Sequence, residues 1–385
     1  MKVLWIDLVS EMGGAQRSLL ELCTTLPAFG VECQAAVPHG PLFDLLKAAG
    51  ITVFPVSPVR ATRRGWGLFT TTAKLLQAPS SVTQIIRAAK PDIIHANSLP
   101  AFMAAGHTSA KSPLFWHVRD LRLPTLLARE ASKRATRIIA ASEAVDEYLF
   151  DILSPRLLGR IRVIRNGVDV ARFKPGDPAA ARRKFGLPEA GPVVGMIAHL
   201  IPWKRHDAFI EAAAAIREKQ PDATFVAVGK DLFNENKRWI AQLEKSVAQH
   251  QLASCFRWIR DLDATDEILP ALSLLLHPAL REPFGRVLCE AMAAQIPVVA
   301  TQSGGPATII KDGVSGLLVP GGDPQLMAEA ALALLADPAR AAKIAEGGRR
   351  RVLEQFTTRH VCEQLVREYR SALAAEGLLA KPAGE

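Results

Sequence analysis

Two glutamates, Glu282 and Glu290, stand eight residues apart in the segment Arg281-Glu-Pro-Phe-Gly-Arg-Val-Leu-Cys-Glu. Pro283 and Gly285 favour a loop that turns into a helix. Eight steps of about 100° return to within roughly 80° of the starting direction, so both carboxylates can face one cavity. Carboxylates accept hydrogen bonds from sugar and ribose hydroxyls, and free N–H groups at a helix start suit hydroxyls or anionic oxygens. The alternative is two surface glutamates of an amphipathic helix.

Two glycines, Gly13 and Gly14, lie between a strand-like run and a predicted helix over Gln16–Leu26. Small residues let a substrate approach the backbone there, and the start of a helix favours anions. The segment lacks the Gly-x-Gly-x-x-Gly pattern of dinucleotide-binding proteins. The alternative is a plain turn between a strand and a helix.

A histidine ends each of two further apolar runs. His117 ends Leu114-Phe-Trp-His, and His95 follows Ile94. Open α/β sheets bind ligands beyond the carboxyl ends of their strands, so both His117 and His95 are candidates. The alternative is a structural histidine whose hydrogen bonds are satisfied within the core.

These candidates need a scaffold, and short apolar runs alternate with helical patterns along most of the chain. The runs are almost continuously apolar, as expected when helices cover both faces of a parallel sheet. The first half has predicted strands at Val3–Leu8, Cys33–Val37, Ile51–Pro55, Asp92–His95, Leu114–His117, Arg137–Ala140 and Ile161–Ile164. The second half has them at Pro192–Ala198, Thr224–Val228, Cys255–Trp258, Leu274–His277 and Pro297–Thr301. The pattern predicts two doubly wound α/β domains.

Turn-forming residues place the domain boundary. Asn166-Gly167 and Pro175-Gly-Asp-Pro interrupt the alternation, and the chain is helical from Pro324 onward. We therefore expect an N-terminal domain over residues 1–168, a C-terminal domain over 169–358 and a terminal helix with its tail over 359–385. A terminal helix of this kind often packs on the other domain.

Composition limits the function classes. The chain has 385 residues, 49% of them hydrophobic and 22% charged, which suits two or three folded domains. Lys and Arg number 47 against 38 for Asp and Glu, and nearly all of the excess lies in residues 1–165. A basic half favours a phosphate-bearing substrate, an anionic membrane or nucleic acid, and charge alone does not choose among them. A solvated basic surface is the alternative.

Five cysteines without a Cys-x-x-Cys pair suggest neither a disulfide framework nor a zinc site. We expect a cytoplasmic protein. No apolar run reaches the roughly 18 residues of a spanning helix, so any membrane contact should be peripheral, at the inner face.

Several longer motifs together resemble one family. They are Arg281-Glu-Pro-Phe-Gly, Glu290-Ala-Met-Ala-Ala, Ile296-Pro-Val-Val-Ala-Thr, Ser303-Gly-Gly-Pro, Asp312-Gly-Val-Ser-Gly-Leu-Leu-Val-Pro, Gly13-Gly14-Ala-Gln, Asn166-Gly-Val-Asp and Trp203-Lys204. The chain resembles the family 4 glycosyltransferases, retaining enzymes of the GT-B fold. That resemblance implies two Rossmann-like domains facing across a cleft, with the acceptor on the N-terminal domain and a nucleotide sugar on the C-terminal one.

The resemblance also implies roles for single residues. Glu282 would bind hydroxyls of the donor sugar, and Glu290 would bind the ribose of the donor nucleotide. Backbone amides of Phe284, Gly285 and Arg286 would assist.

Three further roles follow from the resemblance. Lys204 would neutralise the donor diphosphate, which a metal ion does in other folds, so no metal or cofactor is expected. His117 would face the donor sugar, and Gly13 and Gly14 would lie near the donor phosphate. The donor phosphate itself would accept the proton of the acceptor, so that no protein base is required.

One departure from the family concerns the diphosphate. The family usually has an arginine five residues before the lysine, whereas this chain has His199. A histidine is only partly cationic near neutral pH and lacks the bidentate fork of an arginine. We expect weaker donor binding, or a different phosphate geometry, unless Arg205 compensates.

A basic and aromatic stretch could touch a membrane or the acceptor. Arg60, Arg63, Arg64 and Trp66 lie in a long connection of the basic half. Arginines suit anionic head groups and a tryptophan can insert beside them. The alternative is a helix that packs Trp66 into the core.

The sequence thus predicts a retaining glycosyltransferase that moves a sugar from a nucleoside-diphosphate sugar to an acceptor hydroxyl on a cell-envelope polysaccharide or a lipid-linked glycan. A sugar-nucleotide 2-epimerase of the same layout and a non-catalytic nucleotide- or glycan-binding protein are the alternatives. Nucleic-acid binding fits only the charge, because no motif supports it. The donor base, the sugar and the oligomeric state leave no signature.

Overall fold

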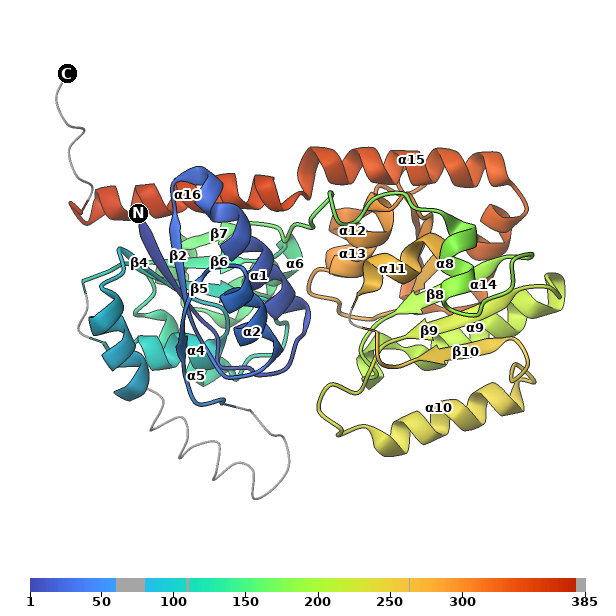
Figure 1. The fold of residues 1–385 in the computed structure, drawn as a ribbon, viewed down its shortest axis with the longest axis horizontal. Helices are drawn as coiled ribbons and strands as arrows, with labels where there is room; N and C mark the ends of the chain where they lie inside the picture. The colour runs from blue at the N-terminus through green and yellow to red at the C-terminus, as the bar shows by residue number, and fades with distance from the viewer. Residues whose placement is uncertain (60–79, 109–110, 263, 379–385) are drawn as a thin grey trace. The chain divides into compact units, whose positions relative to one another are not determined.

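The computed structural model describes residues 1–59, 80–108, 111–262 and 264–378. It divides into two compact α/β units, Met1–Gly167 with Thr358–Glu385, and Val168–Thr357 (Figure 1). The residues of the predicted membrane or acceptor segment, Arg60, Arg63, Arg64 and Trp66, lie outside the described residues.

The first unit is built on a seven-stranded sheet with the strand order β3-β2-β1-β4-β5-β6-β7. Every adjacent pair is parallel. The strands are β1 (Lys2–Ile6), β2 (Glu32–Val37), β3 (Thr52–Pro55), β4 (Ile93–Ala96), β5 (Leu114–Val118), β6 (Arg137–Ala140) and β7 (Ile161–Val163). The order reverses direction between β1 and β4, which is where such sheets bind ligands.

Helices alternate with these strands. They are α1 (Gly14–Thr25), the 3₁₀ turn η1 (Leu26–Phe29), α2 (Pro41–Ala48), α4 (Leu99–Ala105), α5 (Thr125–Ser132), α6 (Glu143–Ile152) and α7 (Pro155–Leu158). Residues 80–89 are also helical. The serine hydroxyls of Ser98 and Ser142 accept hydrogen bonds from backbone N–H groups at the starts of α4 and α6, as N-cap residues do.

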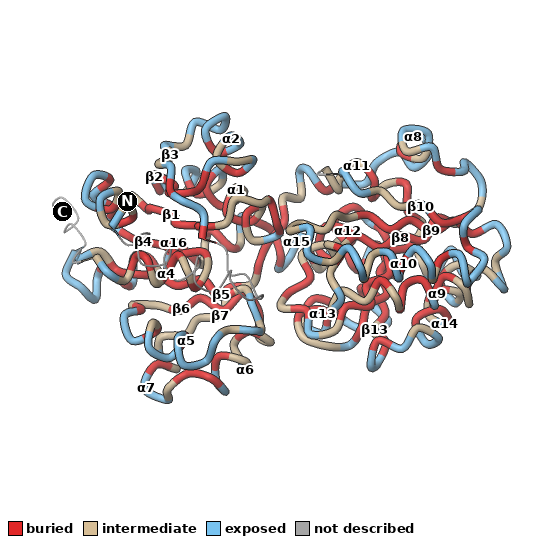
Figure 2. The backbone as a smooth tube through the Cα atoms, turned by 90° about the horizontal axis from the view of Figure 1, so that it is seen from below, coloured by how far each residue is buried: buried red, intermediate tan, exposed pale blue. Residues whose placement is uncertain are grey.

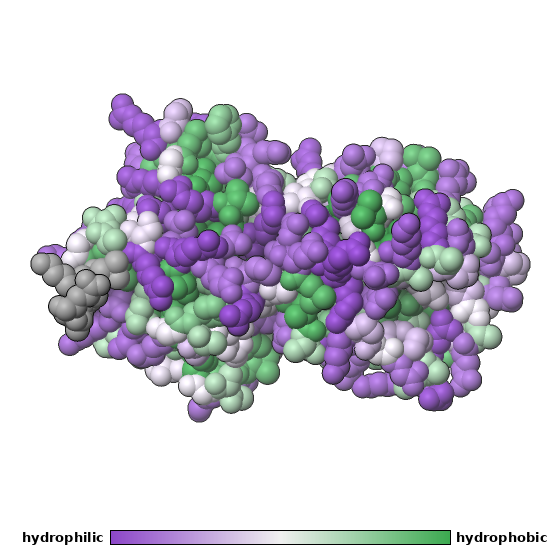
Figure 3. All heavy atoms as spheres, turned by 90° about the horizontal axis from the view of Figure 1, so that it is seen from above, coloured by the Kyte–Doolittle hydropathy of each residue, from purple (hydrophilic) through white to green (hydrophobic). Residues whose placement is uncertain are grey.

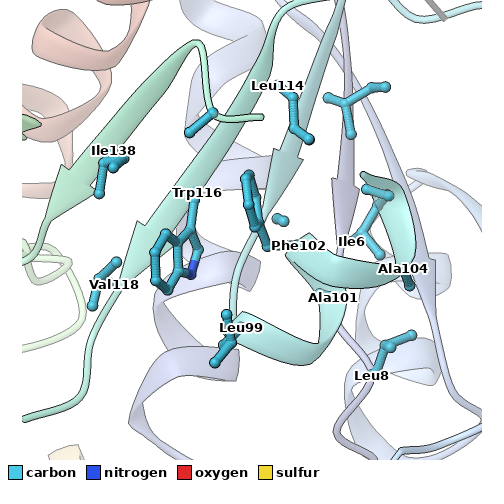
Figure 4. Packing of buried hydrophobic residues seen from close by; sticks show 14 of the residues in the cluster. Ile6, Leu8, Leu99, Ala101, Phe102, Ala104, Leu114, Trp116, Val118 and Ile138 are labelled. Atoms are coloured by element: carbon cyan, nitrogen blue, oxygen red, sulfur yellow. The ribbon is translucent and has the colours of Figure 1, made fainter. Parts of the chain in front are cut away.

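Large side chains fill the space between this sheet and its helices. Trp116 of β5 stacks on Phe102 of α4 with ring centroids 5.2 Å apart. Figure 4 shows Leu99, Val118 and Ile138 gathered around this pair. The aromatic stack therefore anchors the helix after β4 to the centre of the sheet.

The last helix of the chain, α16 (Thr358–Ala375), belongs to the first unit. Its apolar face carries Leu365 and Tyr369, which are fully buried in one cluster with Trp5 and Leu19. The terminal helix thus returns to the N-terminal unit.

The second unit has a six-stranded parallel sheet with the order β10-β9-β8-β11-β12-β13. Its strands are β8 (Val193–Ile197), β9 (Thr224–Val228), β10 (Phe256–Ile259), β11 (Leu274–His277), β12 (Val298–Thr301) and β13 (Leu317–Val319). The order here reverses between β8 and β11. The strand β13 was not predicted, because three residues inside a turn-rich motif give no strand signal of their own.

The helices of the second unit are α8 (Pro178–Lys184), α9 (His206–Lys219), α10 (Lys237–Gln249), α11 (Thr265–Ile268), α12 (Arg286–Ala293), α13 (Gly305–Ile309), α14 (Pro324–Leu335) and α15 (Pro338–Gln355). Short 3₁₀ turns are η2 (Pro202–Lys204), η3 (Leu269–Ala271) and η4 (Pro320–Gly322). Two separate apolar clusters cover the two faces of its sheet. The two doubly wound domains predicted from the alternating pattern are confirmed.

The sheets form the interior of each unit and the surface is polar. Most strand residues are buried, whereas the outer faces of the helices are exposed (Figure 2). The face in Figure 3 is mostly hydrophilic, with hydrophobic areas between the hydrophilic side chains. Among the described residues, none of the helices is long and apolar enough to span a membrane.

Candidate functional site

The loop between β11 and α12 carries Glu282. Gly285 precedes α12 with a φ of 95°, a conformation that favours glycine. Gly304 and Gly305 pack on the same loop, and the Gly305 N–H donates a hydrogen bond to the Glu282 carbonyl at 2.8 Å. A Cβ on Gly305 would stand 2.1 Å from the Phe284 carbonyl oxygen. The Ser303-Gly-Gly-Pro motif is therefore needed to hold the carboxylate loop in place.

The Glu282 side chain lies in a buried cluster with two basic side chains, those of Lys204 and His277. Lys204 Nζ and His277 Nε2 both contact its Oε2 atom, His277 at 3.2 Å. The Lys204 and Glu282 side chains are only 12% and 8% exposed. Burial raises the pKa of Glu282, but the Lys204 ammonium and His277 lower it more, to about 2. Glu282 is therefore a carboxylate that can only accept hydrogen bonds.

Lys204 is held by a tight turn after β8. Lys204 ends the 3₁₀ turn η2, and α9 begins at His206. Arg205 between them has a φ of 60°, which breaks the helical path. The Lys204 ammonium lies 4.2 Å from the centre of the Trp203 ring, and the Leu280 N–H donates to the Trp203 carbonyl. The turn is thus fastened to the loop that carries Glu282.

Glu290 lies on α12 with its own partners. Arg286 Nε donates to its Oε1 at 2.9 Å, one turn earlier on the same helix, and Thr265 Oγ1 donates to its Oε2 at 3.2 Å. Counted over the whole residue, Glu282 is 6% and Glu290 is 5% exposed, so neither is a surface glutamate. Glu282 lies on the loop and Glu290 on the helix that follows it. Because they have different partners, they form two separate polar groups.

Two further residues predicted to bind the donor nucleotide sugar, His199 and Arg205, lie between β8 and α9. Arg205 Nε is bound by Asp207 Oδ2 at 2.9 Å, so its guanidinium already has a carboxylate partner. His199 is half-buried. A Cβ on Gly229 would stand 1.9 Å from the Ala198 carbonyl oxygen, so the end of β9 packs tightly on this loop.

A neutral histidine supports the lysine turn from behind. His206 is fully buried, edge-on to Trp239 and stacked with Trp258. Burial and the nearby Lys204 charge lower its pKa to about 3. It adds no second positive charge beside Lys204.

The first unit has a polar cluster at the ends of β1, β4 and β5. Asp7 is fully buried after β1 and accepts hydrogen bonds from Asn97 Nδ2 at 2.7 Å and Gln16 Nε2 at 2.9 Å. The Gly13 N–H in turn donates to Gln16 Oε1 at 3.1 Å. Burial raises the pKa of Asp7, while these donors lower it. The glycine loop with Gly13 and Gly14 is thus tied to the sheet through Gln16 and Asp7.

His95 and His117 occupy the middle of this cluster. His95 Nε2 lies 3.2 Å from His117 Nδ1, and Arg119 Nη2 lies 3.3 Å from the same His117 atom. On its other side, His95 Nδ1 lies 2.6 Å from the Tyr369 hydroxyl. Burial, and then the Arg119 charge, hold the pKa of both histidines well below the ordinary value. Both rings are therefore neutral near pH 7.

Several residues of these clusters were not found from the sequence. His277, Asn97 and Arg119 each lie at or just past the carboxyl end of a strand, which is the signal that singled out His117. Tyr369 left no such signal, because it lies on a helix more than 250 residues further along the chain. The described residues include no group of three or more potential metal ligands.

Family models match the chain over both units. The model of the glycosyl transferases group 1 matches residues 177–351, and the model of glycosyltransferase family 4 matches residues 12–172. The chain belongs to the family 4 glycosyltransferases, and the fold is GT-B, which confirms both expectations from the sequence.

Relatives and solved structures are similar over large parts of the chain. D-inositol 3-phosphate glycosyltransferases from Salinispora arenicola and Acidothermus cellulolyticus are 35% and 37% identical, over 63% and 56% of this chain. The matches cover 56% and 49% of those proteins, so the chain spans about half the length of the curated relatives it matches.

Among solved structures, Anabaena HepE with UDP and glucose has a TM-score of 0.83 at 25% identity, covering 96% of this chain and 100% of that one. Sucrose-phosphate synthase from Thermosynechococcus elongatus has a TM-score of 0.82 at 22% identity, covering 97% and 100%. The second likeness concerns the fold alone.

Proposed function

We propose that this chain transfers a sugar from a nucleoside-diphosphate sugar to an acceptor hydroxyl, with retention of the anomeric configuration. The observation that carries the proposal is the buried Lys204–Glu282 pair beside the start of α12. An ionised carboxylate binds sugar hydroxyls, and a fixed ammonium stabilises the negative charge that develops on a departing diphosphate.

The site supplies these groups in fixed positions. Lys204 and His277 both contact Oε2 of Glu282, and within the described residues Oε1 has no hydrogen-bond partner and is available for a sugar hydroxyl. The ammonium of Lys204 has three protons, so it can bind Glu282 and still donate to a phosphate oxygen. Glu290 would bind the ribose, and the amides of Phe284, Gly285 and Arg286 would bind sugar or phosphate oxygens. In this proposal the enzyme accelerates transfer mainly by positioning the substrates and neutralising the charge of the leaving group.

No protein base is required in this mechanism. The donor phosphate accepts the proton of the acceptor hydroxyl on the face from which the nucleotide departs, which gives retention. In the first unit, His117 would donate a hydrogen bond to the sugar, and Gly13 and Gly14 would lie near the phosphate. No metal or cofactor has a role in this proposal, because Lys204 supplies the positive charge.

The donor and acceptor are chosen from chemistry and from the relatives. HepE was solved with UDP and glucose, so UDP-glucose is the first donor to test. Residues 1–165 have 20 basic and 12 acidic side chains, which suits an anionic acceptor such as a lipid-linked glycan or a cell-envelope polysaccharide. D-inositol 3-phosphate enters the acceptor screen because the relatives are named for it.

We extend the proposal to location. A cytoplasmic enzyme acting at the inner face of the membrane would use Arg60, Arg63, Arg64 and Trp66 to hold anionic lipid. Flotation with phosphatidylglycerol vesicles tests this, and it is wrong if replacing the three arginines by alanine leaves binding unchanged.

Calorimetry with UDP, GDP and ADP tests the donor site. We expect micromolar binding of one nucleotide that is lost in Lys204→Ala and Glu290→Ala and kept in the exposed control Glu346→Ala. Incubation with the matching nucleotide sugar then separates the alternatives. A glycosylated acceptor supports transfer, an epimerised sugar would indicate a 2-epimerase, and binding without turnover would indicate a non-catalytic protein.

A further inference from the structure

A chain of hydrogen bonds runs from the terminal helix to His117. It passes from the Tyr369 hydroxyl to His95 Nδ1, and from His95 Nε2 to His117 Nδ1. The other ring nitrogen of His117, Nε2, is buried and has no hydrogen-bond partner in the described part of the chain. A buried polar atom without a partner is costly, so its partner is expected to be a ligand.

Arg119 sets the direction of these bonds at His117. A guanidinium can only donate, so the Arg119 Nη2 contact requires a lone pair on His117 Nδ1. The orientation of Arg119 is itself fixed, because its Nε donates to Asn97 Oδ1 at 3.1 Å and its Nη1 donates to Asn166 Oδ1. Asn97 in turn donates through Nδ2 to Asp7.

The same direction continues to Tyr369. With a lone pair on His117 Nδ1, the proton between the two rings must lie on His95 Nε2. A neutral His95 then has a lone pair on Nδ1, which accepts the Tyr369 O–H at 2.6 Å. The reverse order would place a proton on His117 Nδ1, directly against the Arg119 donor. Only one tautomer of each histidine satisfies all four groups.

We propose that Tyr369 and His95 are positioning residues that, together with Arg119, fix His117 as the Nε2–H tautomer, so that it donates a hydrogen bond to an oxygen of the bound sugar. The role toward sugar rests on the proposed function, whereas the tautomer does not. Because Nε2 carries the proton, His117 acts as a hydrogen-bond donor and does not remove the proton of the acceptor. A helix at the end of the chain thus sets the chemistry of a residue on β5.

Nitrogen-15 spectra of histidine-labelled protein test the tautomers directly. Among the nine histidines, the signals of these two can be assigned through their loss in His95→Gln and His117→Gln. We expect both His95 and His117 to show a protonated Nε2 and an unprotonated Nδ1 in the wild type. A proton on His117 Nδ1 would overturn the proposal, whatever the protein's activity.

Tyr369→Phe removes the hydroxyl but keeps the ring that packs edge-on against Phe115. Without its donor, His95 should populate the other tautomer, and its two nitrogen signals should shift toward each other. The chain has only two tyrosines, so Tyr148→Phe is the matched control. The Tyr148 hydroxyl accepts from the Leu123 N–H, outside the histidine chain, and its loss should leave both histidines unchanged. Unchanged His95 signals in Tyr369→Phe would also overturn the proposal.

A double-mutant cycle tests the consequence for turnover. Loss of one positioning hydrogen bond should lower kcat about fivefold in Tyr369→Phe, with little change in nucleotide affinity. In a His117→Gln background the same substitution should change kcat by less than about twofold. An equal effect in both backgrounds would mean that Tyr369 only stabilises the fold. If the tautomers are as expected but no sugar is transferred, the proposed function fails and the assignment of the tautomers stands.

Discussion

Each unit buries a polar cluster at the carboxyl ends of its central strands, and the two clusters treat charge in opposite ways. The cluster after β11 keeps charge, because Lys204 and Glu282 neutralise each other and the pKa of Glu282 stays at about 2. In the cluster after β4 and β5, His95 and His117 lose their charge, since burial and Arg119 both oppose protonation. A buried group therefore keeps its charge where an opposite charge touches it and otherwise becomes a directional hydrogen-bonding group.

This contrast fits the roles in catalysis that we propose for the two units. A diphosphate leaving group needs a full positive charge, which Lys204 supplies. A sugar hydroxyl needs a donor in a fixed direction, which His117 supplies. Four substitutions test this contrast.

Lys204→Met removes the positive charge from the charged cluster while keeping most of its volume. We expect transfer to fall about 100- to 1,000-fold, because the departing diphosphate loses its fixed cation. Initial rates with the identified donor measure this, and Lys219→Met, at an exposed lysine on α9, is the control. A loss below about tenfold would show that Lys204 does not stabilise the leaving group.

Gly305→Ala displaces the loop that carries the charged cluster. Its Cβ would stand 2.1 Å from the Phe284 carbonyl oxygen, and both are backbone positions that cannot move easily. We expect a loss of about 3 kcal/mol in the free energy of unfolding, measured by urea titration. Gly159→Ala has open space around it and should cost less than about 0.5 kcal/mol. Equal stabilities of the two variants would contradict the close packing.

The pH dependence of stability should reveal the buried neutral histidines and the charged Glu282. The neutral histidines bind protons only on unfolding, so the free energy of unfolding should fall as the pH drops below about 6.5. The clearest case is His206, whose folded pKa is about 3. His206→Leu should lessen the pH slope between pH 6.5 and 3 by about 1.4 kcal/mol per pH unit. Glu282, with its pKa lowered to about 2, adds a loss from its ordinary value of 4.5 downward. An unchanged slope in His206→Leu would mean that this histidine is charged in the fold.

His199→Arg adds a fixed cation on the loop after β8, five residues before Lys204. Arg205 is already bound to Asp207, so a new arginine should strengthen diphosphate binding about fivefold. Calorimetry with the nucleotide that the wild type binds measures this, and His250→Arg at an exposed turn is the control. A failure to gain affinity would show that His199 is not the weak point of the donor site.

Local sequence patterns were enough to predict most of the elements and the candidate positions. Continuous apolar runs predicted the strands of both sheets, since strands covered on two faces need no polar residues. Motifs and strand ends are enough to single out Glu282, Glu290, Lys204 and His117 from the sequence alone. It could not supply β13, whose three residues are a strand only because they pair with β12.

Which groups meet depends on contacts between distant parts of the chain. Lys204 and Glu282 are 78 residues apart and His95 and Tyr369 are 274 apart. Spacing along a helix or strand predicts only neighbours a few residues away, and such distant partners leave no pattern in the sequence. The partner sets the protonation state of a buried group, because solvent no longer does. Whether a carboxylate is charged, or which nitrogen of a histidine holds the proton, was therefore decided by the fold.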